Sequence, residues 1–205
     1  INTLMVALAK AGKRVVRLKG GDPMIFGRAT EEIDACRSAG IAVEVVPGIT
    51  AAQGAASRLK VSLTQRSAVR RLQYVTGHSA QGRLPADIDW SSLADPATTT
   101  VIYMPKRSLP ELSAVAISYG LAPDTPVIAI AAATQPDQTV VAGTIATIAA
   151  RVDEAAPAGP MLVMIGRALA DATIGEGHIS HFNGLQLQAG SSIDNARIAA
   201  SRRLR

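Results

Sequence analysis

The chain has 205 residues, of which 48% are hydrophobic and 18% charged, with a formal net charge of +5. This length suits one large domain or two small ones, and the apolar fraction is ample for a core. Aromatic residues make up only 3% of the chain, which argues against the stacking platforms of single-strand nucleic-acid binders. One cysteine, Cys36, excludes an internal disulfide framework and fits a reducing, cytoplasmic compartment. Because Cys36 falls on a predicted helix, we expect a buried structural thiol.

Metal sites and membrane spans are not expected. Three histidines and one cysteine form no group with metal-ligand spacing. No apolar run reaches the roughly 18–20 residues that a membrane span needs, and the first residues lack the polarity of a signal peptide. The chain begins with Ile1 and enters a helical pattern at once, with apolar residues at Leu4, Met5, Leu8 and Ala11. We therefore expect a chain that lacks an N-terminal segment.

Hydrophobic runs alternate with helical patterns along the rest of the chain. The first third predicts strands at 15–18 and 42–46 and helices at 28–39 and 50–59. Further along we expect strands at 72–76, 99–104, 127–132, 139–141 and 161–165, and helices at 109–119 and 145–152. Such alternation predicts an α/β fold with βαβ units and a largely parallel sheet, and the pair within 127–141 could form an antiparallel hairpin at its edge.

Polar and basic residues interrupt this pattern near 66–71 and again beyond about 171. We therefore predict the remainder of one α/β domain over 1–68, a second α/β domain over 69–170, and a polar, basic tail over 171–205. A basic surface is the plain interpretation of the arginine clusters, and attraction for an anionic ligand with many carboxylates is the more specific one.

The segment VVRLKGGDPMIFGR, residues 15–28, is the first with chemical character. Gly20 and Gly21 allow a turn with positive φ and a close approach of a ligand to the main chain. Asp22 adds a carboxylate that can accept hydrogen bonds from an amine or a hydroxyl. The carboxyl edge of a sheet is where α/β proteins bind ligands, although a plain βα turn uses the same residues. Neither a Walker A loop nor G-x-G-x-x-G is present.

Several segments together resemble one family. The string at 15–28, followed by Glu31-Glu32, is very similar to the signature of uroporphyrinogen-III C-methyltransferases, which are tetrapyrrole methylases. VVPGITAA at 45–52, Leu63-Thr64 with Arg66, VTGH at 75–78 and Tyr103-Met104 match as well. The similarity runs in order from residue 1 to about 167, so the chain is identified as a member of this family.

The resemblance implies two α/β/α domains with S-adenosylmethionine in the cleft between them, the first domain being incomplete here. The implied cofactor contacts are Gly20, Gly21, Asp22, Ile25, Thr50, Ala51, Met104 and Ala133. Thr64 and Arg66 would bind the substrate, Arg66 as a clamp for its carboxylates, whereas Arg28 could instead pair with Glu31 or Glu32.

The implied reaction is methylation of uroporphyrinogen III at C2 and C7 to precorrin-2, towards sirohaem or cobalamin, with S-adenosylhomocysteine as the other product. The family resemblance further implies a cytoplasmic homodimer that takes a small-molecule tetrapyrrole, without nucleic acid, membrane or metal.

Four departures from the family pattern keep alternatives open. The family's opening segment and its Asp- and Lys-bearing region for proton transfer are absent, so no catalytic acid or base is assigned. Gln65 and Ser67 stand where the family has His and Asp. Pro105 replaces a glycine and removes a backbone donor, and Ala133 replaces a glycine and adds a methyl group.

Three alternatives follow from these departures and from the charge. A non-catalytic homologue could still bind the cofactor or a tetrapyrrole. A methylase of another tetrapyrrole is disfavoured, because those enzymes more often carry Ser-Gly-Asp-Pro than the Gly-Gly-Asp-Pro found here. A nucleic-acid methylase or binder rests only on the isoelectric point of about 9.8 and the arginine-rich tail.

Overall fold

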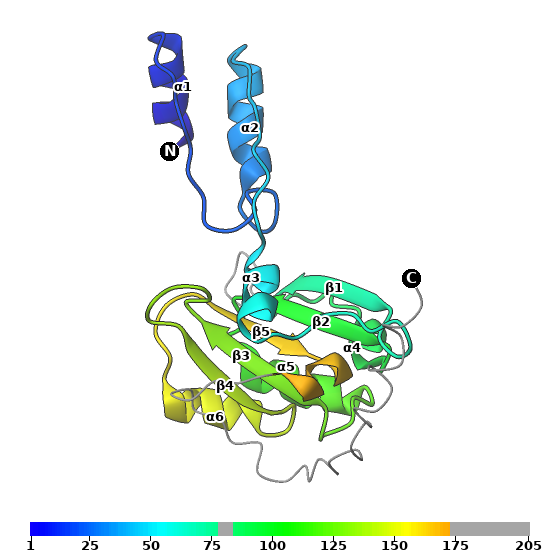
Figure 1. Cartoon of the computed structure of the whole chain (residues 1–205). Helices are drawn as coiled ribbons and strands as arrows, with labels where there is room; N and C mark the ends of the chain where they lie inside the picture. The colour runs from blue at the N-terminus through cyan, green and yellow to red at the C-terminus, as the bar shows by residue number, and fades with distance from the viewer. Residues whose placement is uncertain (78–83, 173–205) are drawn as a thin grey trace, which may run out of the picture.

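The computed structural model describes residues 1–77 and 84–172, and within them it contains one five-stranded sheet with helices on both faces (Figure 1). The helices are α1 (Asn2–Lys10), α2 (Ala29–Ser38), α3 (Ala51–Arg58), α4 (Trp90–Ala94), α5 (Leu109–Ser118), α6 (Ile148–Ala155) and the 3-10 helix η1 (Arg167–Asp171). The strands are β1 (Arg71–Thr76), β2 (Thr98–Tyr103), β3 (Pro126–Ala131), β4 (Thr139–Thr144) and β5 (Met161–Ile165). None of the described helices is long and apolar enough to cross a membrane.

Most predicted elements from residue 50 onward are confirmed to within a residue at each end. The helix predicted at 145–152 begins only at Ile148, because β4 continues to Thr144. Helices α4 and η1 have no counterpart in the prediction, since five residues are too few to display a helical period. His78 of the VTGH motif and nearly all of the predicted tail lie outside the described residues.

The strand order in the sheet is β1-β2-β5-β3-β4. Only the pair β1–β2 is parallel, whereas β5 runs antiparallel to both of its neighbours and β3–β4 forms the predicted antiparallel hairpin. The prediction of a largely parallel sheet is therefore wrong. The apolar runs that suggested it show that both faces of a strand are covered, and they carry no information on strand direction.

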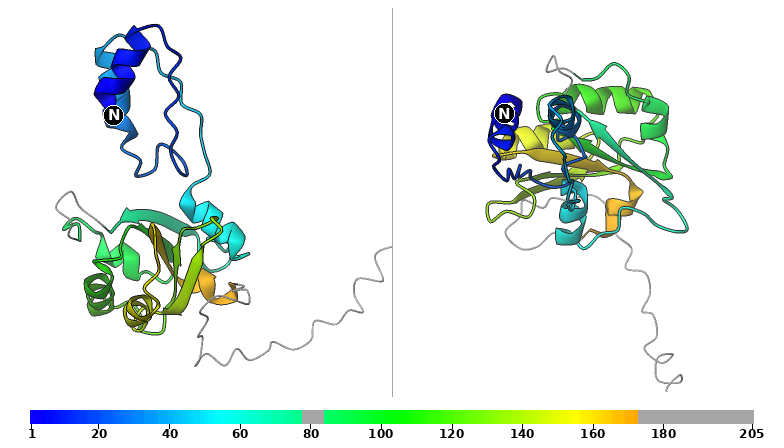
Figure 2. Two further views of the ribbon diagram at one scale, coloured as in Figure 1. Left: turned by 90° about the vertical axis from the view of Figure 1, so that its left-hand side faces the viewer. Right: turned by 90° about the horizontal axis from the view of Figure 1, so that it is seen from above.

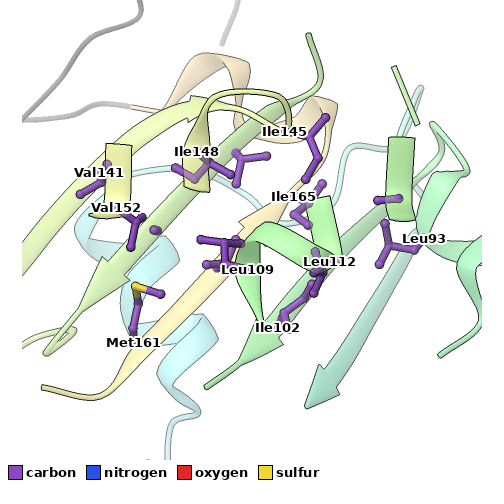
Figure 3. Close-up of a cluster of buried hydrophobic side chains, with 14 of the residues drawn as sticks. Leu93, Ile102, Leu109, Leu112, Val141, Ile145, Ile148, Val152, Met161 and Ile165 are labelled. Atoms are coloured by element: carbon purple, nitrogen blue, oxygen red, sulfur yellow. The ribbon is translucent and has the colours of Figure 1, made fainter. Parts of the chain in front are cut away.

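Strand β5 shows how the two faces are divided, because its side chains alternate between two buried clusters. Met161, Val163 and Ile165 pack with α4, α5 and α6 on one face (Figure 3). Leu162 and Met164 pack with α3 and η1 on the other face. The sheet is thus the middle layer of an α/β/α sandwich. Helix α3, which precedes all five strands in the sequence, covers its second face together with η1.

The first 50 residues form a separate projection beside this sandwich, as Figures 1 and 2 show. Helices α1 and α2 pack against each other, and Cys36 on α2 is buried, as predicted. The strands predicted at 15–18 and 42–46 are not formed. Both segments are extended without a paired strand, and their apolar side chains are exposed, to 80% at Leu18 and 75% at Val46. A strand needs a neighbour for its backbone groups, and the described residues supply none here.

We predict that Leu112→Ala lowers the free energy of unfolding by about 2–5 kcal/mol, because its side chain is fully buried in the cluster under α5. The matched control is Leu4→Ala on α1, a leucine that is 63% exposed and should cost less than about 0.5 kcal/mol. Urea denaturation followed by circular dichroism measures both. Equal losses in the two variants would contradict the assignment of the core.

Candidate functional site

One edge of the sheet brings together the carboxyl ends of three strands. After β1, the N–H of Gly77 donates to the carbonyl of Tyr103 (2.7 Å). After β2, the N–H of Met104 donates to the carbonyl of Met161 at the start of β5 (3.0 Å), and after β3 the N–H of Ala132 donates to Pro160 (2.9 Å). Two of the predicted cofactor contacts, Met104 and Ala133, therefore lie on the same edge.

Helix α3 begins with a complete capping box. The Thr50 hydroxyl accepts from the N–H of Gln53 (3.2 Å), and the Gln53 side chain accepts from the N–H of Thr50 (3.1 Å). This reciprocal pair satisfies two backbone donors that the first turn of a helix would otherwise leave unpaired. Thr50 and Ala51, both predicted cofactor contacts, are thereby fixed at the amino end of α3.

The loop of residues 20–25 is fastened to the turn before α3 by one carboxylate. Asp22 accepts from the N–H of Met24 with Oδ1 (2.8 Å) and from the N–H of Gly48 with Oδ2 (3.1 Å). Gly21 has a φ of +75°, as the sequence predicts, and a Cβ at Gly48 would overlap the Gly21 carbonyl oxygen. The two loops are therefore in backbone contact, and Asp22 is the group that joins them.

Tyr103 connects the end of β2 to these loops. Its ring centroid lies 4.8 Å from that of Phe26 and 5.9 Å from that of Tyr74, and its hydroxyl accepts from the N–H of Ala52 (3.3 Å). Burial raises the pKa of the phenol above its ordinary value. Apart from the match of Tyr103-Met104 to the family, the sequence indicates no role for Tyr103. Its ring partners Phe26 and Tyr74 are distant in sequence, so no local pattern predicts the cluster.

The turn after β3 also contacts helix α3. A Cβ added at Gly54 of α3 would lie 3.0 Å from Cγ2 of Thr134, so helix and turn are in close contact. Ala133 packs against the buried cluster between α3 and the sheet. The methyl group of Ala133, which we expected to replace a glycine, is thus in contact with the core.

Backbone strain marks the same loops. Phe26, Arg28, Met104, Ala132 and Thr134 all have φ between +48° and +70°, although none is glycine. Non-glycine residues in this region cost free energy and gather at functional sites. The sequence holds no signal for them, because residue type alone would have favoured glycine at each position.

Ion pairs connect the segment that leads into the first loop to helix α2. Glu32 on α2 accepts from Lys19 (Nζ to Oε2 2.9 Å) and from Arg17 (Nε to Oε1 3.1 Å). The hydrogen bond from Lys19, followed by that from Arg17, lowers the pKa of the Glu32 carboxyl. Arg28 pairs with Glu31 (Nε to Oε1 3.0 Å), which is one of the two pairings that the sequence suggests.

The predicted substrate contacts lie elsewhere. Thr64 and Arg66 are exposed on the segment that leads to β1, where Gln65 forms an isolated bridge with Val69. The N–H of Arg70 donates to the residue just ahead of β2. This segment is therefore at the amino ends of β1 and β2, opposite the edge with Met104.

Known proteins are similar to this chain in sequence and in fold. Residues 1–149 match the family model of the tetrapyrrole (corrin/porphyrin) methylases. The chain belongs to the tetrapyrrole methylases. It is 44% identical over 172 residues to a uroporphyrinogen-III C-methyltransferase of Paracoccus denitrificans, covering 84% of this chain and 60% of that protein. It is also 44% identical to a siroheme synthase of Gluconacetobacter diazotrophicus over 82% of this chain and 36% of that relative, so it spans a minor part of such proteins.

Solved structures of tetrapyrrole methylases agree with the fold. A uroporphyrin-III-C-methyltransferase of Thermus thermophilus superposes with a TM-score of 0.68 at 36% identity, covering 82% of this chain and 70% of that one. The Thermus thermophilus enzyme complexed with S-adenosylhomocysteine gives 0.69 at 30% identity, covering 82% and 72%. The expected mixed α/β fold of this family is thereby confirmed.

The loops of this tetrapyrrole methylase fit a cofactor that is bound chiefly by main chain. A Cβ at Gly20 would meet no other atom within 4 Å, so open space borders that backbone. Met104, which follows Tyr103 in the sequence, has a side chain that is 45% exposed. Among the described residues no group of three or more His, Cys, Asp or Glu side chains could hold a metal ion.

We predict that Gly77→Ala destabilises the protein by about 1–3 kcal/mol, because its Cβ would lie 2.7 Å from Cα and Cβ of the buried Pro105. Gly20→Ala is the control, since that Cβ has free space and should cost less than about 0.5 kcal/mol. Thermal unfolding followed by circular dichroism reports both. If the Gly77→Ala and Gly20→Ala proteins unfolded at the same temperature, the turn after β1 at Gly77 and the turn after β2 at Pro105 would not be in contact.

We predict that Lys19→Met raises the pKa of Glu32 towards the ordinary glutamate value of about 4.3, and that Arg17→Met raises it less. A lowered folded-state pKa contributes stability that is present above the unfolded pKa and is lost as the pH falls through the folded one. Carboxyl-carbon NMR titration of the two variants measures the shifts. An unchanged Glu32 pKa in Lys19→Met would rule out this ion pair in solution.

Proposed function

We propose that this chain binds S-adenosylmethionine and methylates uroporphyrinogen III at C2 and C7, giving precorrin-2 and S-adenosylhomocysteine. The observation that carries the proposal is the gathering of four loops around the amino end of α3, with Asp22 joining two of them. The 44% identity to the Paracoccus denitrificans uroporphyrinogen-III C-methyltransferase supports the choice of substrate.

The proposed cofactor contacts are mostly backbone groups and small side chains. Gly20 offers main chain beside open space, Gly21 lies against the backbone of Ile49 and Ala51, and Thr50 and Ala51 offer the first turn of a helix. Met104 and Ala133, with Ile25 and Asp22 of the first loop, complete the proposed set. Asp22 acts here through position, because both of its oxygens already accept backbone N–H groups.

S-adenosylmethionine supplies a methyl group on a sulfonium, which is its own leaving group. The work left to the protein is orientation of the acceptor carbon and exclusion of water. The capping box of α3, the Asp22 hydrogen bonds and the Tyr103 contacts hold the loops in fixed positions for that purpose. Each of these groups is satisfied within the protein, so little reorganisation is needed on binding.

Thr64 and Arg66 remain the proposed substrate contacts. They lie at the other end of the six-residue strand β2 from Met104, which corresponds to roughly 20 Å. A carboxylate clamp at Arg66 would therefore serve a peripheral acetate or propionate group of the macrocycle, far from the reacting carbon.

The two glycine replacements do not argue for loss of binding. Pro105 is buried against Gly77, and Ala133 packs into the core, so neither side chain fills the edge where Met104 lies. The division into 1–68, 69–170 and 171–205, the homodimer and the cytoplasmic location belong to the same proposal.

We predict that S-adenosylhomocysteine binds this chain saturably in calorimetry and that Asp22→Ala weakens binding at least about tenfold. The substitution removes the two charge-assisted hydrogen bonds that join the loop of residues 20–25 to Gly48, so the two loops are no longer held in one arrangement before the ligand binds. The control is Asp34→Ala, which removes an exposed carboxylate paired with Arg37 on α2 and should leave affinity unchanged.

The proposed cofactor site would be overturned if the unaltered chain did not bind S-adenosylhomocysteine, or if Asp22→Ala bound it with equal affinity. An anaerobic assay with uroporphyrinogen III and S-adenosylmethionine then separates a methylase from a homologue that only binds. Binding without formation of precorrin-2 would leave cofactor recognition standing and remove the proposed reaction.

A further inference from the structure

A cavity of about 220 Å³ lies at the sheet edge described above, beside Met104. One wall is the turn between β2 and α5, residues 104–108, and the other is the segment 159–161 that leads into β5, with Gly77 between them. A water molecule occupies about 30 Å³ in the liquid, so the cavity has room for a group of several heavy atoms. Its position makes it an extension of the proposed cofactor site.

Among the described residues, two cations and no acidic side chain line this cavity. Lys106 donates to the carbonyl of Pro157 (Nζ to O 2.5 Å), which positions the ammonium group and leaves its charge unneutralised. Arg107 forms no ion pair among the described residues, and neither does Glu111, the acidic residue in the first turn of α5. The described lining of the cavity is therefore positive, and no acidic side chain of the described residues neutralises either charge.

The turn that carries the cations is rigid. Met104 is hydrogen-bonded to Met161, and Ser108 Oγ lies 2.7 Å from the carbonyl oxygen of Gly77 and 3.2 Å from that of Pro105. Pro105 fixes its own φ between these two anchors. Cations on a fixed turn lose little conformational freedom when an anion binds.

We propose that Lys106 and Arg107 form a carboxylate-binding subsite next to the cofactor site. A guanidinium group binds carboxylates in bidentate fashion, and an ammonium group adds a second charge-assisted hydrogen bond. The carboxylate can come from the amino-acid end of S-adenosylmethionine or from an acetate or propionate of the tetrapyrrole. This subsite rests on the proposed function, because it is the neighbouring Met104 that connects it to the cofactor.

The test compares the unaltered 205-residue chain with the double variant Lys106→Gln/Arg107→Gln. The ligands are S-adenosylhomocysteine, 5′-methylthioadenosine, which lacks the amino-acid end, and uroporphyrin III, titrated at one fixed salt concentration. Charged hydrogen bonds of this type correspond to at least about a tenfold loss of affinity. Loss for S-adenosylhomocysteine with unchanged methylthioadenosine assigns the subsite to the cofactor, and loss for uroporphyrin alone assigns it to the substrate.

The matched control is Arg14→Gln/Arg37→Gln, which removes the same charge from exposed positions before and on α2. Unchanged affinities in the Lys106/Arg107 variant overturn the subsite, and so does an equal loss in the control or for methylthioadenosine. A chain that binds none of the three ligands, before any substitution, contradicts the proposed function itself and removes the subsite with it.

Discussion

Helix α3 and its C-cap residue bury Ala52, Ala55 and Leu59 against the face of the sheet that α5 and α6 leave uncovered. Strands β3 and β5 are apolar on both sides and cannot remain exposed on either, so this contact is a condition for the sheet itself. Small side chains on α3 allow a close approach, which places its amino end at the edge where β1, β2 and β3 finish. The candidate site is thus a consequence of how the sheet is covered.

The loops at that edge are held by interactions of different kinds. Asp22 binds two backbone N–H groups, Thr50 caps a helix, and Tyr103 combines ring contacts with a hydrogen bond. None of these groups needs a ligand to be satisfied, so the edge is organised before anything binds. The positive φ values at Met104 and Ala132 indicate that this organisation is maintained against local backbone preference.

Sequence reasoning succeeded where a residue type has one physical consequence. The Gly-Gly turn predicted the positive φ of Gly21, and the Ala-rich segment after Thr50 predicted helix α3. It failed where the same residues permit two structures. The apolar run of β3 fits a parallel or an antiparallel strand equally, and a strand pattern such as 15–18 needs a neighbour that only the fold can provide.

The candidate site shows the same division. The motifs led to Asp22, Thr50 and Met104 without any knowledge of where they lie, whereas the function of Asp22 as a link between loops depends on Gly48, which is distant in sequence. Lys106 and Arg107 gave no signal as single residues in a basic chain. Their significance comes from the cavity between two turns, which has no counterpart in the linear sequence.

The unpaired segments 15–18 and 42–46 affect the solubility of the protein. An extended stretch with exposed valines that pairs with no other strand of the described residues is similar to an open sheet edge, and open edges add strands from other molecules. Exposed charged residues lie at both stretches, Arg14 just before the first and Glu44 within the second. Such gatekeepers slow intermolecular stacking through repulsion and hydration, so the solubility of the protein depends on ionic strength through these few side chains.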